Sequence, residues 1–294
     1  MHVRGSIAAI TAGWEEREDE DQEMRDHLGG RTVNLRIYAR VEEIMARDAE
    51  LRHAIRERAD RLREQHELYR VRLVHAMAAA RELQRREPEV RDGNGTSAML
   101  EAEREAAIDA VRTLDAFHLA RVAALHAEFE AALRPLERDG VVRHRRELAR
   151  ILEGTSAMCV AGGHVVVLLH RMRLLDVLGL SGAQPIVAWS AGAMVLGERV
   201  VLFHDSPPQG EGNAEVYEQG LAAHSGLVPL PHAKKRLHLH DAQRVSLLAR
   251  RFAPDPCVAL DPLTRMEWDG HVWRGDPGTL RLAEDGVLVQ AGAA

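Results

Sequence analysis

IVAWSAGAMVLGE, residues 186–198, is the stretch that decides the fold. A short apolar run leads to Ser190, and small residues then lead into a helix-forming sequence. A strand that turns directly into a helix is the unit from which parallel sheets flanked by helices are built. Such a turn can also present a serine at the N-terminus of a helix, where it can act as a nucleophile. Small residues equally permit a tight turn with no chemistry, so the stretch alone leaves both interpretations open.

The rest of the chain continues this alternation of strands and helices. Residues 7–12 (IAAITA) and 157–163 (AMCVAGG) are short apolar runs that predict buried strands, and residues 164–179 predict a helix. RVVLFHD predicts another strand, residues 233–252 a further helix, and the segments from CVALD onward predict strands and hairpins. The sequence therefore predicts an α/β fold with a mostly parallel sheet flanked by helices.

A long helical region interrupts this pattern after the first strand. Residues 33–87 contain no glycine or proline, and apolar residues recur in steps of three and four, as in one long amphipathic helix. A second helix is expected from Ser97 to about Leu133, and the two predict an antiparallel helical hairpin. The expected organisation is residues 1–18 as the first strand, 19–140 as the hairpin insertion and 141–294 as the remainder of the α/β domain.

Composition excludes several classes of function. The formal net charge of -6 argues against a nucleic-acid-binding protein, which usually carries a basic domain or stripe. No apolar run is long enough to span a bilayer, and the N-terminus lacks the apolar core of a signal peptide, so a cytoplasmic protein without a membrane partner is expected. The histidines are not accompanied by other ligands at metal-binding spacing, so neither a metal nor another cofactor is expected.

Two further segments are expected at the edge of the sheet where Ser190 lies. Gly163 follows a predicted strand and can present its N–H group opposite that of Ala191, which would form an oxyanion hole with two donors. A turn that needs a positive φ explains the same glycine without any chemistry. GWEERE (13–18) follows the first strand, so Glu15, Glu16 or Arg17 could bind a charged end of a substrate. The alternative is a solvated, charged loop.

Four elements in this order resemble the dipeptidase E and cyanophycinase family of serine peptidases, within the class I glutamine amidotransferase-like superfamily. The resemblance covers about half the chain, roughly residues 155–275 together with 5–16. It rests on Gly162-Gly163, on Ser190-Ala191-Gly192-Ala193, on GLVPLPHAKKRLHLHDAQRVSLLARRF (226–252), which contains His232 and Arg236, and on CVALDPLT (257–264). It implies a flavodoxin-like α/β fold and a serine hydrolase that acts on a small peptide or isopeptide bond near acidic residues.

By this resemblance Ser190 is the nucleophile and His232 the general base, while Gly162 and Arg236 are substrate-binding candidates. Histidine suits its role because its ordinary pKa lets it accept a proton near neutral pH. The family's acidic turn often reads Asp-Glu-x-Thr, but Pro262 stands here in the glutamate's place. Asp261 is the candidate acid of the triad. The weaker stand-ins are Glu267, Asp269 and Asp205.

The sequence also departs from the family beside the nucleophile and the base. Ala188 replaces a glycine usually found two residues before the serine, and Leu230-Pro231 replaces an acidic residue before the histidine. A catalytically weak or inactive module that binds a ligand or partner is therefore an alternative. In that case the hairpin would mediate assembly, as a candidate homodimer surface. A glutamine amidotransferase would need a cysteine where Ser190 stands, and Cys159 and Cys257 lie elsewhere in apolar runs.

Overall fold

The chain forms two compact units, each built from strands and helices. The computed structural model describes residues 4–86, 95–205 and 212–292. Unit 1 comprises Met1–Arg61, Ala124–Glu198 and Gly220–Ala223. Unit 2 comprises Leu62–Ala123, Arg199–Gln219 and His224–Ala294.

Unit 1 contains a four-stranded parallel sheet in the order β2-β1-β3-β4. Its strands are β1 (Ser6–Ile10), β2 (Thr32–Asn34), β3 (Thr155–Val160) and β4 (Ile186–Ala188). Strand β1 is buried along most of its length, as expected for an apolar run inside a parallel sheet. Ile10 pairs with Val160, and Val160 with Ala188. The carboxyl ends of these three strands therefore meet at one edge, and the predicted α/β class is confirmed.

Helices flank this sheet. They are α1 (Gln22–His27), α2 (Ile37–Arg47), α5 (Asp139–Glu153), α6 (Val165–Leu174), α7 (Val177–Leu180) and α8 (Ala191–Val195), with short 3-10 segments at Ala12–Arg17 and Pro135–Glu137. In α5 the buried residues Val141, His144, Leu148 and Leu152 recur every three or four positions, so one face of the helix packs inward. The single helix expected over residues 164–179 is two helices, because Asp176 adopts a left-handed conformation (φ 43°) between α6 and α7.

Residues 33–87 do not form one continuous helix. The segment begins in β2, continues through α2, and only then enters α3 (Ala49–Arg85). The break lies at Asp48, whose backbone is extended (φ -116°, ψ 91°). Its carboxylate accepts a hydrogen bond from the Leu51 N–H at 2.9 Å. The Arg138 guanidinium donates through two of its nitrogens to the two oxygens of the same carboxylate. Aspartate ends one helix and caps the next in this way because its side chain competes for backbone N–H groups.

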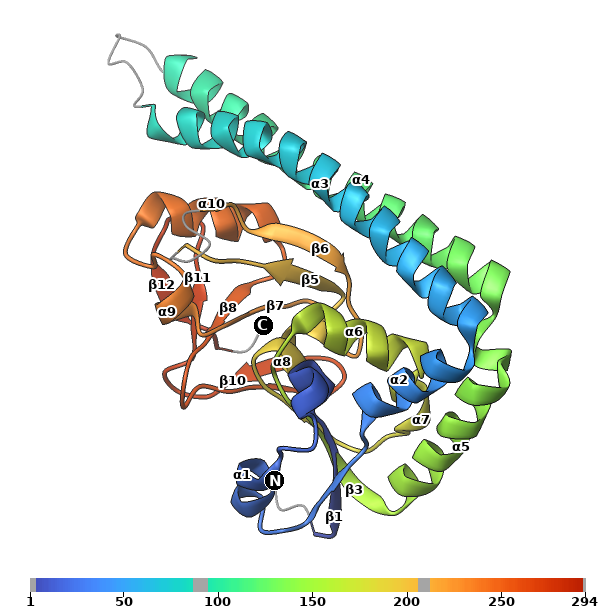
Figure 1. The fold of residues 1–294 in the computed structure, drawn as a ribbon. Coiled ribbons are helices and arrows are strands. Elements are labelled where there is room, and N and C mark those ends of the chain that lie inside the picture. The colour runs from blue at the N-terminus through green and yellow to red at the C-terminus, as the bar shows by residue number, and fades with distance from the viewer. Residues whose placement is uncertain (1–3, 87–94, 206–211, 293–294) are drawn as a thin grey trace. The chain divides into compact units, whose positions relative to one another are not determined.

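The helical hairpin after β1 is confirmed. α3 and α4 (Gly95–Leu133) run side by side in opposite directions, and the Arg104 guanidinium on α4 donates to the Leu83 and Gln84 carbonyls near the end of α3 (Figure 1). Apolar residues of both helices are buried: Leu62, Tyr69, Leu73 and Ala80 on α3, and Ile108, Val111, Leu114 and Val122 on α4. Among the described helices, none is both long enough and apolar enough to cross a lipid bilayer.

Unit 2 carries a mixed sheet in the order β12-β11-β8-β7, in which only β7 and β8 are parallel. Its strands are β7 (Val228–Pro231), β8 (Cys257–Leu260), β11 (Leu280–Leu282) and β12 (Leu288–Gln290). Two antiparallel ribbons accompany it: β5 (Arg199–Leu202) with β6 (Glu215–Gln219), and β9 (Met266–Trp268) with β10 (Trp273–Gly275). Besides most of α3 and α4, unit 2 contains the helices α9 (Ala233–Arg236) and α10 (Ala242–Phe252), where the sequence predicted one helix.

Candidate active site

Ser190 lies on a strained turn between β4 and α8. Its backbone has φ 53° and ψ -127°, a conformation that is otherwise almost confined to glycine and that costs a few kcal/mol in other residues. The side chain is half-buried, and Ala191 immediately begins α8. A serine held in this way at a strand-to-helix turn is the geometry of a nucleophile elbow.

Gly162 packs directly against Ser190. A methyl group at Gly162 would lie 2.7 Å from the Ser190 Cβ and 2.9 Å from its Oγ, closer than real side chains approach. The same methyl would lie 3.5 Å from the Ala191 nitrogen. The glycine is therefore required to bring the end of β3 against the serine hydroxyl. This contact brings together three residues that the sequence had placed at one edge.

Gly163 has to be a glycine for a different reason, namely its backbone conformation and its close approach to Gly13. Its φ of 112° is unfavourable for any other residue, and an added Cβ would lie 2.2 Å from the Gly13 carbonyl oxygen. That oxygen accepts the His164 N–H at 2.6 Å. In the described part of the chain, neither the Gly163 N–H nor the Ala191 N–H donates to a protein acceptor. Both groups are available to an oxyanion, although whether they serve one remains a prediction.

The segment after β1 packs through Gly13 against the turn at Gly162–Gly163. Glu15 is half-buried and adopts φ 58° and ψ -127°, nearly the conformation of Ser190. Glu16 is exposed and accepts the Tyr38 hydroxyl at 2.8 Å; hydrogen bonds from its own backbone N–H and from Tyr38 lower the pKa of its carboxyl group. Arg17 pairs with Glu20 at the surface. The contact between Gly13 and the Gly162–His164 turn was not predicted from the sequence. A glycine directly after a strand was the one signal that could have indicated it.

His232 and Asp261 lie in unit 2, directly after the parallel strands β7 and β8. His232 is exposed, adopts a left-handed conformation (φ 57°) and donates its backbone N–H to Leu260 at 2.9 Å. Asp261 is buried, and its carboxylate accepts the Lys234 N–H at 3.1 Å in the first turn of α9. Within the described residues, no hydrogen bond joins the His232 imidazole to Asp261. The role of Asp261 as the triad acid stays a prediction.

The other candidate acids each have partners within unit 2. Asp205 forms a forked ion pair with Arg244 and accepts the His238 N–H at 3.0 Å. Asp269 accepts the N–H groups of the turn between β9 and β10, which lowers its pKa to about 2. Glu267 pairs with Arg265 at the surface, 3.4 Å away. The Arg236 guanidinium lies over the Phe203 ring, 6.0 Å from its centroid.

The two cysteines are buried inside strands. Cys159 belongs to β3 and Cys257 begins β8. Burial raises the pKa of both thiols, that of Cys257 to about 12. A thiol with such a pKa holds its proton at neutral pH and is a poor nucleophile. The buried positions fit the interpretation of both cysteines as small hydrophobic residues.

Comparison with known proteins gives few matches. No protein-family model matches the chain, and no curated protein matches it. Among solved structures, it is similar to the crystal structure of a peptidase from an acI-B1 actinobacterium, with 13% sequence identity and a TM-score of 0.35. The alignment covers 78% of this chain and 89% of the peptidase.

Proposed function

We propose that this chain is a serine hydrolase that cleaves a small peptide or isopeptide bond through an acyl-enzyme on Ser190. The observation that carries the proposal is the strained backbone of Ser190 between β4 and α8, with Gly162 packed against its hydroxyl. Strain of this kind persists only where the surrounding structure enforces it, and it is concentrated at functional sites.

In the proposed reaction, the Ser190 Oγ attacks the substrate carbonyl carbon while its proton passes to the His232 imidazole. The Gly163 and Ala191 N–H groups donate to the resulting oxyanion. When the intermediate collapses, the C–N bond breaks, the histidine proton goes to the leaving amine, and an ester remains on Ser190. His232 then takes a proton from water as the water oxygen attacks the ester carbon. When the ester C–O bond breaks and the acid leaves, that proton passes from His232 to the Ser190 Oγ and restores the serine.

The substrate class rests on the resemblance to dipeptidase E and cyanophycinase, which implies peptide or isopeptide bonds near acidic residues. Asp261 is the proposed acid that orients His232. Glu15, Glu16 and Arg236 are the candidates for contacts with a charged end of the substrate. No cofactor is invoked, because a serine, a base and two N–H donors are sufficient for acyl transfer.

A fluorophosphonate probe tests the nucleophile. We expect the wild-type chain to be labelled covalently and Ser190→Ala to remain unlabelled, because the probe forms its bond with an activated serine oxygen. Labelling is followed by in-gel fluorescence, and the modified peptide is identified by mass spectrometry. Ser156→Ala is the matched control, since Ser156 is an exposed serine on β3 of the same sheet. Equal labelling of wild type and Ser190→Ala, or labelling of neither, would contradict the proposal.

A second candidate function is a catalytically weak or inactive module that assembles through the helical hairpin. The observation that favours it is the exposure of large apolar side chains on α3 and α4, with Leu68 59%, Val71 62% and Phe117 52% exposed. Exposed apolar residues that gather on one element often mark an interaction surface. If the hairpin forms a homodimer, light scattering should give twice the chain mass, and Leu68→Glu combined with Val71→Glu should give a monomer. A monomeric wild-type chain would rule out the dimer.

A further inference from the structure

A cluster of four aromatic side chains lies where the hairpin meets β6, within unit 2. His66 and Tyr69 belong to α3, His118 to α4 and Tyr217 to β6. The His118 ring is stacked on the Tyr69 ring with the centroids 4.1 Å apart, and the His66 ring meets the edge of the Tyr217 ring at 4.8 Å. The centroids of the two histidine rings are 5.7 Å apart. These four residues, the histidine cluster, have no part in the proposed reaction.

His118 is built into the cluster as a neutral imidazole. The residue is 1% exposed, and its Nε2 lies 2.9 Å from the Tyr217 carbonyl oxygen. A carbonyl oxygen can only accept, so Nε2 is the nitrogen that carries the proton. The other nitrogen, Nδ1, has no hydrogen-bond partner among the described residues. A second proton on this ring would therefore be a buried N–H group without an acceptor there, together with a buried positive charge.

The charges around His118 do not offset this cost. Asp115 on α4 and Glu218 on β6 are the carboxylates whose charges favour the protonated ring. Asp115 is already paired with Arg251 of α10, at 2.7 Å. Burial is the largest effect and lowers the pKa of His118, and a positive charge on His66 lowers it further. The neutral ring is therefore the form that the closed contact stabilises.

The two phenols supply no negative charge to the cluster. Burial raises the pKa of Tyr69 and of Tyr217, that of Tyr217 to about 12, so both phenols keep their protons at neutral pH. The charges that act on the Tyr217 phenol are those of Glu218 and of Arg63 on α3. Neither tyrosine can therefore form an ion pair with a protonated histidine.

His66 can carry a positive charge more easily than His118. Its side chain is 15% exposed, and its Nε2 lies 3.2 Å from the carboxylate of Glu215 at the start of β6. Glu215 also accepts the Arg70 Nε–H at 2.9 Å. A protonated His66 gains an ion pair with Glu215, whereas a protonated His118 would face the charge of His66 inside the protein. The cluster therefore accommodates one positive charge, on His66.

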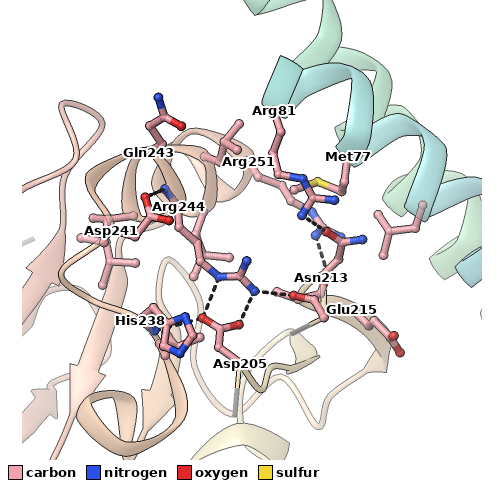
Figure 2. Close-up of a pocket in the computed structure, with 18 of the residues that line it drawn as sticks. Met77, Arg81, Asp205, Asn213, Glu215, His238, Asp241, Gln243, Arg244 and Arg251 are labelled. Carbon is pink, nitrogen blue, oxygen red and sulfur yellow. Dashed lines mark hydrogen bonds and ion pairs between the residues drawn. The ribbon is translucent and has the colours of Figure 1, made fainter. Parts of the chain in front are cut away.

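The strand that bears Tyr217 also borders a cavity of about 510 Å³ (Figure 2). Residues 213–215, which lead into β6, form part of its wall, and α3 forms another part. Figure 2 shows Arg81 of α3 next to Asn213, to which it donates at 2.8 Å. A movement of β6 away from the hairpin would therefore change the wall of this cavity.

We propose that the histidine cluster is a pH-sensitive switch, which holds β6 against the hairpin at neutral pH and releases it in mild acid. Protonation of His118 places a charge and an N–H group without an acceptor in the contact, and separation of β6 from α4 lets water solvate both. The hydrogen bond from Nε2 to the Tyr217 carbonyl breaks in the same movement. The switch contains no residue proposed for catalysis, so it operates whether or not Ser190 is reactive.

The pH range of the switch follows from the ordinary pKa of histidine. In the open contact the His118 imidazole is solvated, and its pKa is about 6.5. In the closed contact burial lowers this pKa. The closed contact is therefore most stable above about pH 6.5, and it loses stability as the pH falls from there toward the lowered pKa.

Hydrogen–deuterium exchange of the full chain at about pH 7.5 and about pH 5.5 tests the switch. Mass spectrometry follows the peptides that contain β6 and residues 115–121, and the rates are corrected for the intrinsic effect of pH on exchange. Between the two pH values, we expect the protection of these peptides to fall about three- to tenfold more in the wild type than in His118→Gln. Glutamine has an N–H donor for the Tyr217 carbonyl but takes up no proton.

Two further variants make the result independent of one substitution. His118→Phe keeps a ring against Tyr69 and cannot be protonated, so it should show the same small loss of protection as His118→Gln. His75→Gln is the matched control, because His75 is an exposed histidine of α3 in unit 2, and it should lose protection as the wild type does. An equal loss in the wild type and both His118 variants, or no loss in the wild type, would overturn the proposal. A loss spread evenly over unit 2 would also overturn it, since the contact with β6 would then not open by itself.

Discussion

Replacing Asp115 with alanine is expected to lower the free energy of unfolding by about 3 to 5 kcal/mol, because it leaves the buried charge of Arg251 without its partner. The Arg251 side chain is 1% exposed, and its Nε and Nη2 each lie 2.7 Å from one of the two Asp115 carboxylate oxygens. Arg251 belongs to α10 and Asp115 to α4. The pair therefore fastens the hairpin to the rest of unit 2.

Tyr69 completes this buried network. Its hydroxyl donates to the Asp115 Oδ1 at 2.8 Å and accepts N–H groups from Arg251 at 2.9 Å and from Val216 at 3.1 Å. Burial raises the pKa of Tyr69, so the hydroxyl keeps the proton that it donates. With every polar atom in use, loss of one member leaves several buried groups without partners, and that is the costly case.

Urea unfolding followed by circular dichroism measures this loss. The matched control is Asp109→Ala on the same helix, since Asp109 is 61% exposed, pairs with Arg112 at the surface and should change stability by less than about 1 kcal/mol. The double variant Asp115→Leu with Arg251→Met removes both charges and should recover most of the stability lost by Asp115→Ala. A loss below about 1 kcal/mol in Asp115→Ala would show that the pair does not hold the hairpin in place.

This network could not be predicted from the sequence. Tyr69 fits the apolar pattern of α3, in which apolar residues recur in steps of three and four. An aspartate at position 115 and an arginine at 251 look like ordinary surface residues of amphipathic helices. The pair is separated by 136 residues, and no local pattern encodes which charged side chains meet across such a distance. A cavity of unit 2 was missed for the same reason, because its walls come from α3, α10, β11 and the loops near Asp205 and Leu237.

The strands of the parallel sheet were predictable because their apolar runs are short and bounded by glycine or polar residues. Strand β2 was missed, since Thr32–Asn34 is only three residues long and adjoins a helical pattern. The break at Asp48 was missed too, because aspartate is tolerated inside helices as well as at caps. The convergence of Ser190 and Gly162 was predictable, since residues that follow neighbouring parallel strands meet at one edge of the sheet. The strained backbone of Glu15 left no signal, because glutamate rarely adopts that conformation.

Replacing Gly162 with alanine is expected to slow fluorophosphonate labelling of Ser190 by about 10²- to 10³-fold. The new methyl would lie 2.7 Å from the Ser190 Cβ and 2.9 Å from its Oγ, so the serine or the turn must move by several tenths of an ångström. A displacement of this size would move the hydroxyl relative to the proposed N–H donors of Gly163 and Ala191, and attack depends steeply on such geometry. The backbone of Gly162 is not in the left-handed region, so alanine is tolerated there apart from this contact.

The measurement is the second-order rate of labelling, with Ser190→Ala setting the background. Gly154→Ala is the control, because Gly154 lies just before the other end of β3 and its added methyl would meet only the Ile151 carbonyl, at 3.4 Å. Thermal unfolding of Gly162→Ala is measured in parallel, so that loss of the nucleophile geometry is distinguished from loss of the fold. If the folded Gly162→Ala variant were labelled at the wild-type rate, the contact between β3 and Ser190 would have no part in the reactivity of the serine. Any reactivity of Ser190 would then depend on its position at the start of α8 and not on Gly162.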